Sequence, residues 1–164
     1  MIRIGENTYY HAIICLNGHI ISDSIESFET KMGFCKDCGK PTINKCQNCK
    51  NPIHGDMYIP NFVNAIQMES PSFCYGCGNP YPWTKSKINA LEELIDFEEK
   101  LSETNKEDLK KNINDIINET PRTKIATIKF KHLLTKMGKE TGIMAKNLAV
   151  EMASETAKKY FLEK

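Results

Sequence analysis

The chain has 164 residues, 40% of them hydrophobic and 26% charged, and its formal net charge is +1. This is the composition of an ordinary soluble globular protein. It excludes a transmembrane span, because no stretch approaches the roughly 18 consecutive apolar residues that a spanning helix needs. The first residues also lack the features of a signal peptide, so we expect a cytoplasmic protein.

The first half of the chain is rich in turn-forming residues and contains all seven cysteines. Two short strands are predicted over residues 9–14 and 19–22, joined by a tight turn at Asn17-Gly18. Short strands separated by glycine and proline are typical of a small module built on turns. We therefore predict an α+β protein in which residues 1–84 form a β-rich double zinc ribbon.

The candidate metal ligands of this half come in four closely spaced pairs. These are Cys15 and His19, Cys35 and Cys38, Cys46 and Cys49, and Cys74 and Cys77. Two residues between cysteines allow a tight turn to direct both sulfurs at one ion. An odd number of cysteines in a reducing compartment argues against a disulfide framework. Eight ligands make two tetrahedral sites, so we predict two structural Zn²⁺ ions.

The spacing leaves two groupings of these pairs open. In a sequential grouping the first two pairs bind one ion and the last two bind the other. In an interleaved grouping the pairs are exchanged, as in cross-braced folds. The sequential grouping is favoured because its loops are local and cost less closure entropy.

An enzymatic role is the least supported by the sequence. A zinc site with four protein ligands has no open position for water or substrate. No nucleophile-elbow pattern surrounds any serine, and no glycine-rich phosphate-binding motif is present.

Residues 85–164 are predicted to form about four helices, because apolar residues recur there at helical spacing. The first begins at Ser86. The second begins at Thr104, where a capping box is predicted. The third follows Pro121, and the fourth ends near Phe161 after a turn at the glycines that follow the third helix. We interpret this segment as an interaction and assembly domain.

Charge is unevenly distributed over the predicted helices. Residues 85–120 contain 6 basic and 10 acidic side chains, whereas residues 121–164 contain 10 basic and 4 acidic ones. The predicted helix over 122–139 is basic and amphipathic, which is compatible with nucleic acid, with anionic lipid or with a solvated face. The candidate nucleic-acid contacts are Arg122, Lys124, Lys129, Lys131 and Lys136.

Small residues repeat every four positions in the last predicted helix, at Ala145, Ala149, Ala153 and Ala157. Such a stripe allows two helices to approach closely. The partner helix belongs either to the same chain, to a second copy or to another protein, so homo-oligomerisation through residues 138–161 is one expectation.

Several motifs together resemble a bacterial family of uncharacterised double-zinc-ribbon proteins, known as a domain of unknown function. They are Cys15-Leu16-Asn17-Gly18-His19, Phe34-Cys35-x-x-Cys38-Gly39, Cys46-x-x-Cys49 with Pro52-Ile53-x-Gly55, and Phe73-Cys74-x-x-Cys77-Gly78-x-Pro80. The resemblance implies a prokaryotic cytosolic zinc protein and supplies no activity. That family usually has arginine where this chain has His54.

Three hypotheses follow from the sequence. The first is a non-enzymatic scaffold whose ribbons contact a protein partner and whose helices mediate assembly. The second is a nucleic-acid-binding zinc-ribbon protein that uses the basic helix. The third and weakest is an accessory of a membrane-active or toxin-like system.

Overall fold

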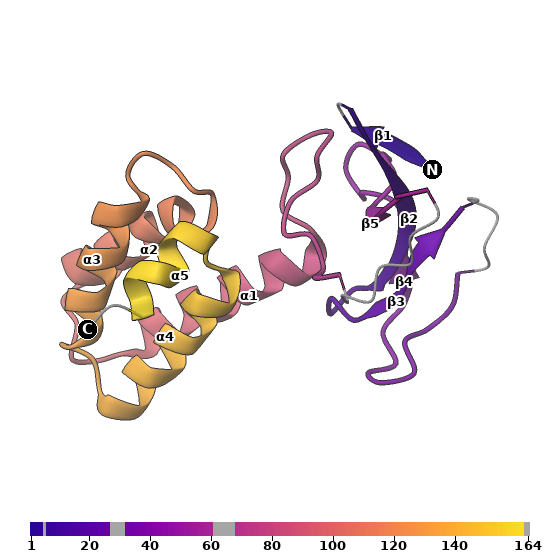
Figure 1. Cartoon of the computed structure of the whole chain (residues 1–164). Coiled ribbons are helices and arrows are strands. Elements are labelled where there is room, and N and C mark those ends of the chain that lie inside the picture. The colour runs from indigo at the N-terminus through magenta and orange to yellow at the C-terminus, as the bar shows by residue number, and fades with distance from the viewer. Residues whose placement is uncertain (5, 27–31, 61–67, 163–164) are drawn as a thin grey trace. The chain divides into compact units, whose positions relative to one another are not determined.

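In the computed structural model, an antiparallel sheet with short turns precedes a run of helices, which confirms the α+β class (Figure 1). The structure describes residues 1–4, 6–26, 32–60 and 68–162. The chain divides into two compact units, Met1–Lys85 and Ser86–Lys164. Among the described residues, no helix is both long and apolar enough to cross a membrane.

One long strand, β2 (Asn7–Cys15), organises the sheet of the first unit. Successive stretches of it pair antiparallel with four shorter strands, namely β1 (Ile2–Ile4), β3 (Ile20–Ile25), β4 (Thr42–Ile43) and β5 (His54–Met57). The pairing of β2 with β3 confirms the predicted hairpin. Gly18, in the turn between them, has φ +90°, a conformation that favours glycine.

The strand β5 was not predicted, because its sequence is polar and lacks an apolar alternation. Its Gly55 explains how the strand fits against its neighbours. A Cβ atom on Gly55 would lie 1.9 Å from the backbone oxygen of Asp23, so only glycine allows this approach of two backbones.

The apolar core of the first unit is small and encloses cysteines. Its buried members are Ala12, Ile14, Cys46, Ile53, Cys74, Tyr81 and Trp83. Trp83 stacks on Tyr81 with ring centroids 4.8 Å apart, and its indole nitrogen donates to the Pro71 carbonyl at 2.9 Å. A Cβ atom on Gly18 would approach the Trp83 Cβ to 3.0 Å. Trp83 therefore packs between the turn that joins Cys15 to His19 and the ring of Tyr81.

Within the described residues, five helices follow the sheet, whereas about four were expected. They are α1 (Pro82–Phe97), α2 (Glu103–Ile117), α3 (Thr123–Leu134), α4 (Lys139–Met152) and α5 (Glu155–Leu162). The first helix begins at Pro82 rather than Ser86, because proline is favoured in the first turn of a helix. The cap of α2 is Ser102 rather than Thr104, since its Oγ accepts from the Asn105 amide at 3.3 Å.

The expected fourth helix is two helices, α4 and α5. Ala153 is extended, with ψ 142°, and ends α4. Ser154 then starts α5, because its hydroxyl accepts a hydrogen bond from the Ala157 amide at 3.3 Å. Its own amide donates to the Ile116 carbonyl at 3.0 Å, which attaches this break to α2.

The second unit has a conventional apolar core. Phe130 of α3 and Phe161 of α5 are fully buried and meet edge to face, with ring centroids 6.1 Å apart. The alanine stripe of the last two helices is buried as well, at Ala145, Ala149, Ala153 and Ala157. These small residues therefore serve close packing inside this unit.

A buried carboxylate joins the end of α1 to the start of α4. Glu98 is 6% exposed and accepts hydrogen bonds from the Gly138 amide at 2.8 Å and from the Thr141 hydroxyl. The Thr141 hydroxyl, and then the surrounding amides, lower the pKa of Glu98. A carboxylate at a helix N-terminus also interacts favourably with the helix dipole, so Glu98 acts as an external cap for α4.

Candidate metal centres

The structure brings all eight predicted ligands together in two clusters. One contains Cys15, His19, Cys35 and Cys38, and the other contains Cys46, Cys49, Cys74 and Cys77. Within each cluster the ligand atoms lie within 4.8 Å of one another. This is the sequential grouping, in which each cluster uses two pairs that are adjacent along the chain.

The separations of the sulfur atoms match one tetrahedral ion in each cluster. Cys15 Sγ lies 3.7 Å from Cys38 Sγ in the first cluster. In the second, Cys46 lies 3.8 Å from Cys77, and Cys49 lies 3.6 Å from Cys74. Ligands about 2.3 Å from a central Zn²⁺ are about 3.8 Å apart along a tetrahedron edge. A disulfide needs about 2.05 Å, and all seven cysteines are free thiols.

The first cluster includes the hairpin of β2 and β3. Cys15 is the last residue of β2, and His19 immediately precedes β3. The His19 ring nitrogen Nδ1 lies 3.5 Å from the Cys35 sulfur, and the His19 amide donates to the Cys15 sulfur at 3.3 Å. The three-residue loop between Cys15 and His19 therefore presents sulfur and imidazole to the same point.

The same pattern of backbone hydrogen bonds occurs in three turns, Cys35–Cys38, Cys46–Cys49 and Cys74–Cys77. In each, the amide of the first cysteine donates to the carbonyl five residues later, and an isolated bridge closes the turn between Phe34 and Pro41, Lys45 and Pro52, and Phe73 and Pro80. The residue after the second cysteine has positive φ in all three, at Gly39, Lys50 and Gly78. The sequence signal for this shared turn is a proline three residues after the second cysteine, at Pro41, Pro52 and Pro80.

Hydrogen bonds to sulfur favour thiolates at some positions. The Asn79 side chain, then its amide, and then the Asn48 side chain lower the pKa of Cys77 to about 6. Burial raises the pKa of Cys35, but the amides of Asp37 and Cys38, followed by His19, bring it down to about 7.

One thiol of the second cluster has the opposite shift. The Asn51 amide lowers the pKa of Cys49, but burial and the neighbouring thiols outweigh it and raise that pKa to about 12. Four thiols this close cannot all ionise without a cation among them. The donor set thus fits a divalent metal ion, whose charge offsets that of the thiolates.

The two clusters differ in burial. Cys46 and Cys74 belong to the apolar core, whereas His19 is exposed. The Tyr81 hydroxyl is buried with no nitrogen or oxygen partner, and burial followed by the neighbouring Cys74 thiolate raises the pKa of Tyr81. The second cluster is therefore the more enclosed of the two.

His54, where the resembling family usually has arginine, lies outside both clusters. His54 packs between Tyr9 and Tyr75, with ring centroids 5.2 Å and 6.3 Å away, and is not among the clustered ligands.

Three of the five basic residues predicted to contact nucleic acid interact within the chain. Arg122 pairs with Asp115 at 3.2 Å. Lys124 lies 5.3 Å above the Tyr160 ring, and Lys131 donates to the Tyr160 carbonyl at 2.9 Å. Lys129 and Lys136 are exposed.

Comparison with known families identifies the chain. Residues 8–161 match the model of the family DUF2321, described as an uncharacterized protein conserved in bacteria. The match spans most of the chain, including both clusters, so the chain belongs to this family. The comparison with curated proteins gives no match, and neither does the comparison with solved structures.

Proposed function

We propose that this member of the DUF2321 family is a non-enzymatic interaction protein whose first unit is organised by two structural Zn²⁺ ions. The observation that carries the proposal is the pair of four-ligand clusters, which together use every cysteine of the chain. A tetrahedral ion held by four protein ligands has no position for water or substrate. When bound, each ion supplies a fixed cross-link between two turns, and its binding energy becomes folding energy.

The donor types favour zinc over the alternatives. Three sulfurs with one imidazole, and four sulfurs, are both common structural zinc sets. Sulfur atoms 3.6–3.8 Å apart suit a single ion, whereas an iron–sulfur cluster would hold its cysteines farther apart. The same distances are too long for a formed disulfide bond.

The Cys35–Cys38 turn of the first cluster offers a surface for a protein partner. Phe34 precedes Cys35 and is 75% exposed, and Met32, two residues earlier, is also exposed. An exposed aromatic ring on a rigid turn is the kind of side chain that dominates binding energy at interfaces. Such a ring loses little conformational entropy on binding, because the turn already fixes its backbone. We infer that Phe34 contacts the partner, while the helical unit mediates assembly.

The substitution Phe34→Lys tests this role without disturbing the turn, because Lys45 occupies the equivalent position of the second turn. The zinc-loaded wild type and Phe34→Lys are compared by co-purification from the native host and mass spectrometry. We expect at least one protein to be retained by the wild type and lost with Phe34→Lys, while both keep two zinc ions. Identical sets of retained proteins contradict the proposal.

Nucleic-acid binding is the second candidate, supported by the exposed Lys129 on α3 and the exposed Lys136 just after its end. It is weakened because the other three basic residues already interact within the chain. Salt-sensitive retention on DNA or RNA, lost when Lys129, Lys131 and Lys136 become glutamate, would replace the first candidate by the second. We expect no such retention at low salt.

A further inference from the structure

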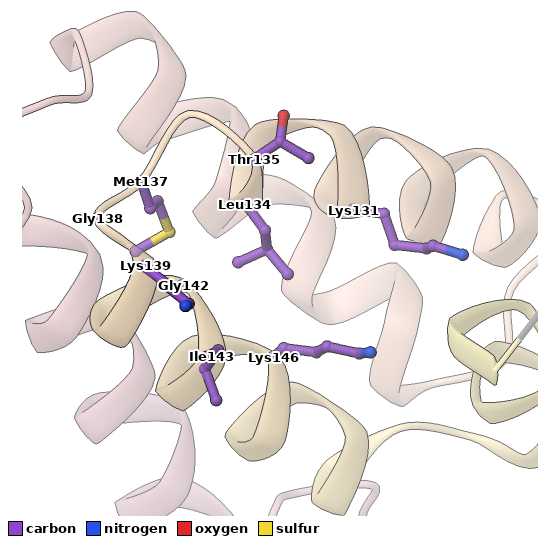
Figure 2. A pocket seen from close by; sticks show the side chains of 9 residues that line it. All are labelled: Lys131, Leu134, Thr135, Met137, Gly138, Lys139, Gly142, Ile143 and Lys146. Atoms are coloured by element: carbon purple, nitrogen blue, oxygen red, sulfur yellow. The ribbon is translucent and has the colours of Figure 1, made fainter. Parts of the chain in front are cut away.

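A groove with an apolar floor and a basic rim lies between the end of α3 and α4 (Figure 2). Its volume is about 460 Å³. Leu134, Met137 and Ile143 supply apolar surface, and the cations are Lys131, Lys139 and Lys146. No acidic side chain lines it. In the described part of the chain, Lys139 and Lys146 form no ion pair, so two of the three cations are available to an anionic partner.

A surface of opposite charge lies on α1 of the same unit. Ala90, Glu93, Leu94 and Phe97 line a shallow hollow of about 230 Å³. Their spacing places them on one face of the helix. Phe97 is 76% exposed, and among the described residues neither Glu93 nor the nearby Glu99 forms an ion pair. We call this face of α1, together with Glu99, the acidic ridge.

We propose that the groove of one chain binds the acidic ridge of a second copy of the same chain. This inference rests on the assembly role proposed above for the helical unit and assigns its surfaces. The ridge presents apolar anchors at helical spacing, the form in which a helix binds a groove between two others. Both surfaces expose large apolar side chains, which mark interaction sites on soluble proteins.

Charge supports the same pairing. The ridge lies in residues 85–120, which carry a net charge of −4, and the groove lies in residues 121–164, with +6. Opposite charges on two surfaces accelerate encounter and fix their register. No residue of the ridge lines the groove of its own chain, and Glu98 holds the end of α1 on α4 through the Gly138 amide and the Thr141 hydroxyl.

The test measures the mass of the zinc-loaded full chain by sedimentation over a range of concentrations, at low and high salt. We expect self-association that weakens with salt. Lys139→Glu with Lys146→Glu, and separately Glu93→Lys with Glu99→Lys, each raise the dissociation constant at least about tenfold. An equimolar mixture of the two variants restores association, because each reversed surface then meets a complementary one.

Apolar contacts are tested with Phe97→Ser against a matched control, Ile125→Ser. Ile125 is 53% exposed on α3 and lies outside the groove and the ridge. We expect Phe97→Ser to weaken self-association at least about tenfold and Ile125→Ser to leave it unchanged.

A chain that stays monomeric, association that charge reversal leaves unchanged, or a mixture that stays dissociated overturns the inference. So does a monomer whose groove retains a different protein. Zinc content and Phe34-dependent retention of a partner are read on the same samples. If both persist in a monomeric chain, the inference on assembly fails while the zinc-organised partner-binding role remains.

Discussion

The two units of this chain differ in the residues that fill their buried positions. In the first, buried positions are shared between a few apolar residues and the cysteines Cys15, Cys35, Cys46 and Cys74. In the second, leucine, isoleucine, alanine and phenylalanine fill the core. A segment with short strands buries little apolar surface to offset its conformational entropy, and we propose that metal ligation supplies the difference. On this proposal, metal-bound cysteines take the place of part of the apolar core in the unit that is built on short strands.

Removal of metal should separate the two units most strongly. Structural zinc contributes about 10 kcal/mol or more of folding free energy in small zinc modules. We therefore expect a chelator to abolish amide protection in residues 1–85 while residues 86–164 keep theirs, as measured by hydrogen exchange with mass spectrometry. Equal loss of protection in both units would contradict the comparison.

The pH dependence of metal binding has a defined sign. Zinc binds thiolates, and thiols such as Cys49, with a pKa near 12, must lose a proton when it binds. Affinity should therefore rise with pH and fall in acid, where protons compete for the sulfur. The zinc dissociation constant, titrated with a competing chelator at several pH values, measures this. An affinity that does not change with pH would exclude thiolate ligation.

The core of the second unit should depend on its aromatic pair and not on metal. Phe130→Ala removes a fully buried ring that packs on Phe161, and such truncations cost about 3–5 kcal/mol. We expect thermal unfolding of residues 86–164 at a lower temperature with zinc content unchanged. Loss of zinc in this variant would show that the two units do not fold independently.

The sheet of the first unit should be intolerant of a methyl group at one glycine. Gly55→Ala places Cβ against the Asp23 backbone oxygen, and we expect a loss of about 3 kcal/mol in chemical denaturation. Gly33→Ala is the matched control, because nothing lies within 4 Å of its Cβ and its stability should not change. Similar stabilities for the two variants would mean that β5 does not approach β3 as described.

The smallest effect concerns the one turn that lacks glycine after its second cysteine. Lys50 has φ +64°, whereas Gly39 and Gly78 occupy the equivalent positions. Lys50→Gly should stabilise the first unit by about 0.5–1 kcal/mol, because glycine adopts this conformation without strain. The reverse change, Gly39→Lys, should destabilise it. Both are measured by chemical denaturation of the zinc-loaded protein, and opposite signs would show that the turns differ.

The sequence was sufficient for the parts that depend on short-range spacing. Pairs of cysteines, the Asn17-Gly18 turn and the helical repeats all act within a few residues, so they were predicted without knowledge of the fold. The strand β5 was missed because its polar residues are held by pairing with β2, which is distant in sequence. The break at Ser154 was missed because its amide bonds the Ile116 carbonyl of another helix.

The grouping of the ligands shows where spacing stops being enough. Closure entropy favoured local loops, but it did not exclude the interleaved arrangement. The structure selects between them through β4, which pairs Thr42 and Ile43 with the end of β2 and so brings the Cys35–Cys38 turn beside Cys15. Charge alone was a weaker guide, since it did not reveal that Arg122, Lys124 and Lys131 interact within the chain.

Native mass spectrometry of freshly prepared protein is the most direct test of the two-metal organisation. The account predicts a mass equal to the chain plus two zinc ions, with all cysteines reduced in the denatured, metal-free sample. A chain that carries clearly fewer than two metal ions, or one whose mass reveals disulfides in place of metal, would contradict it.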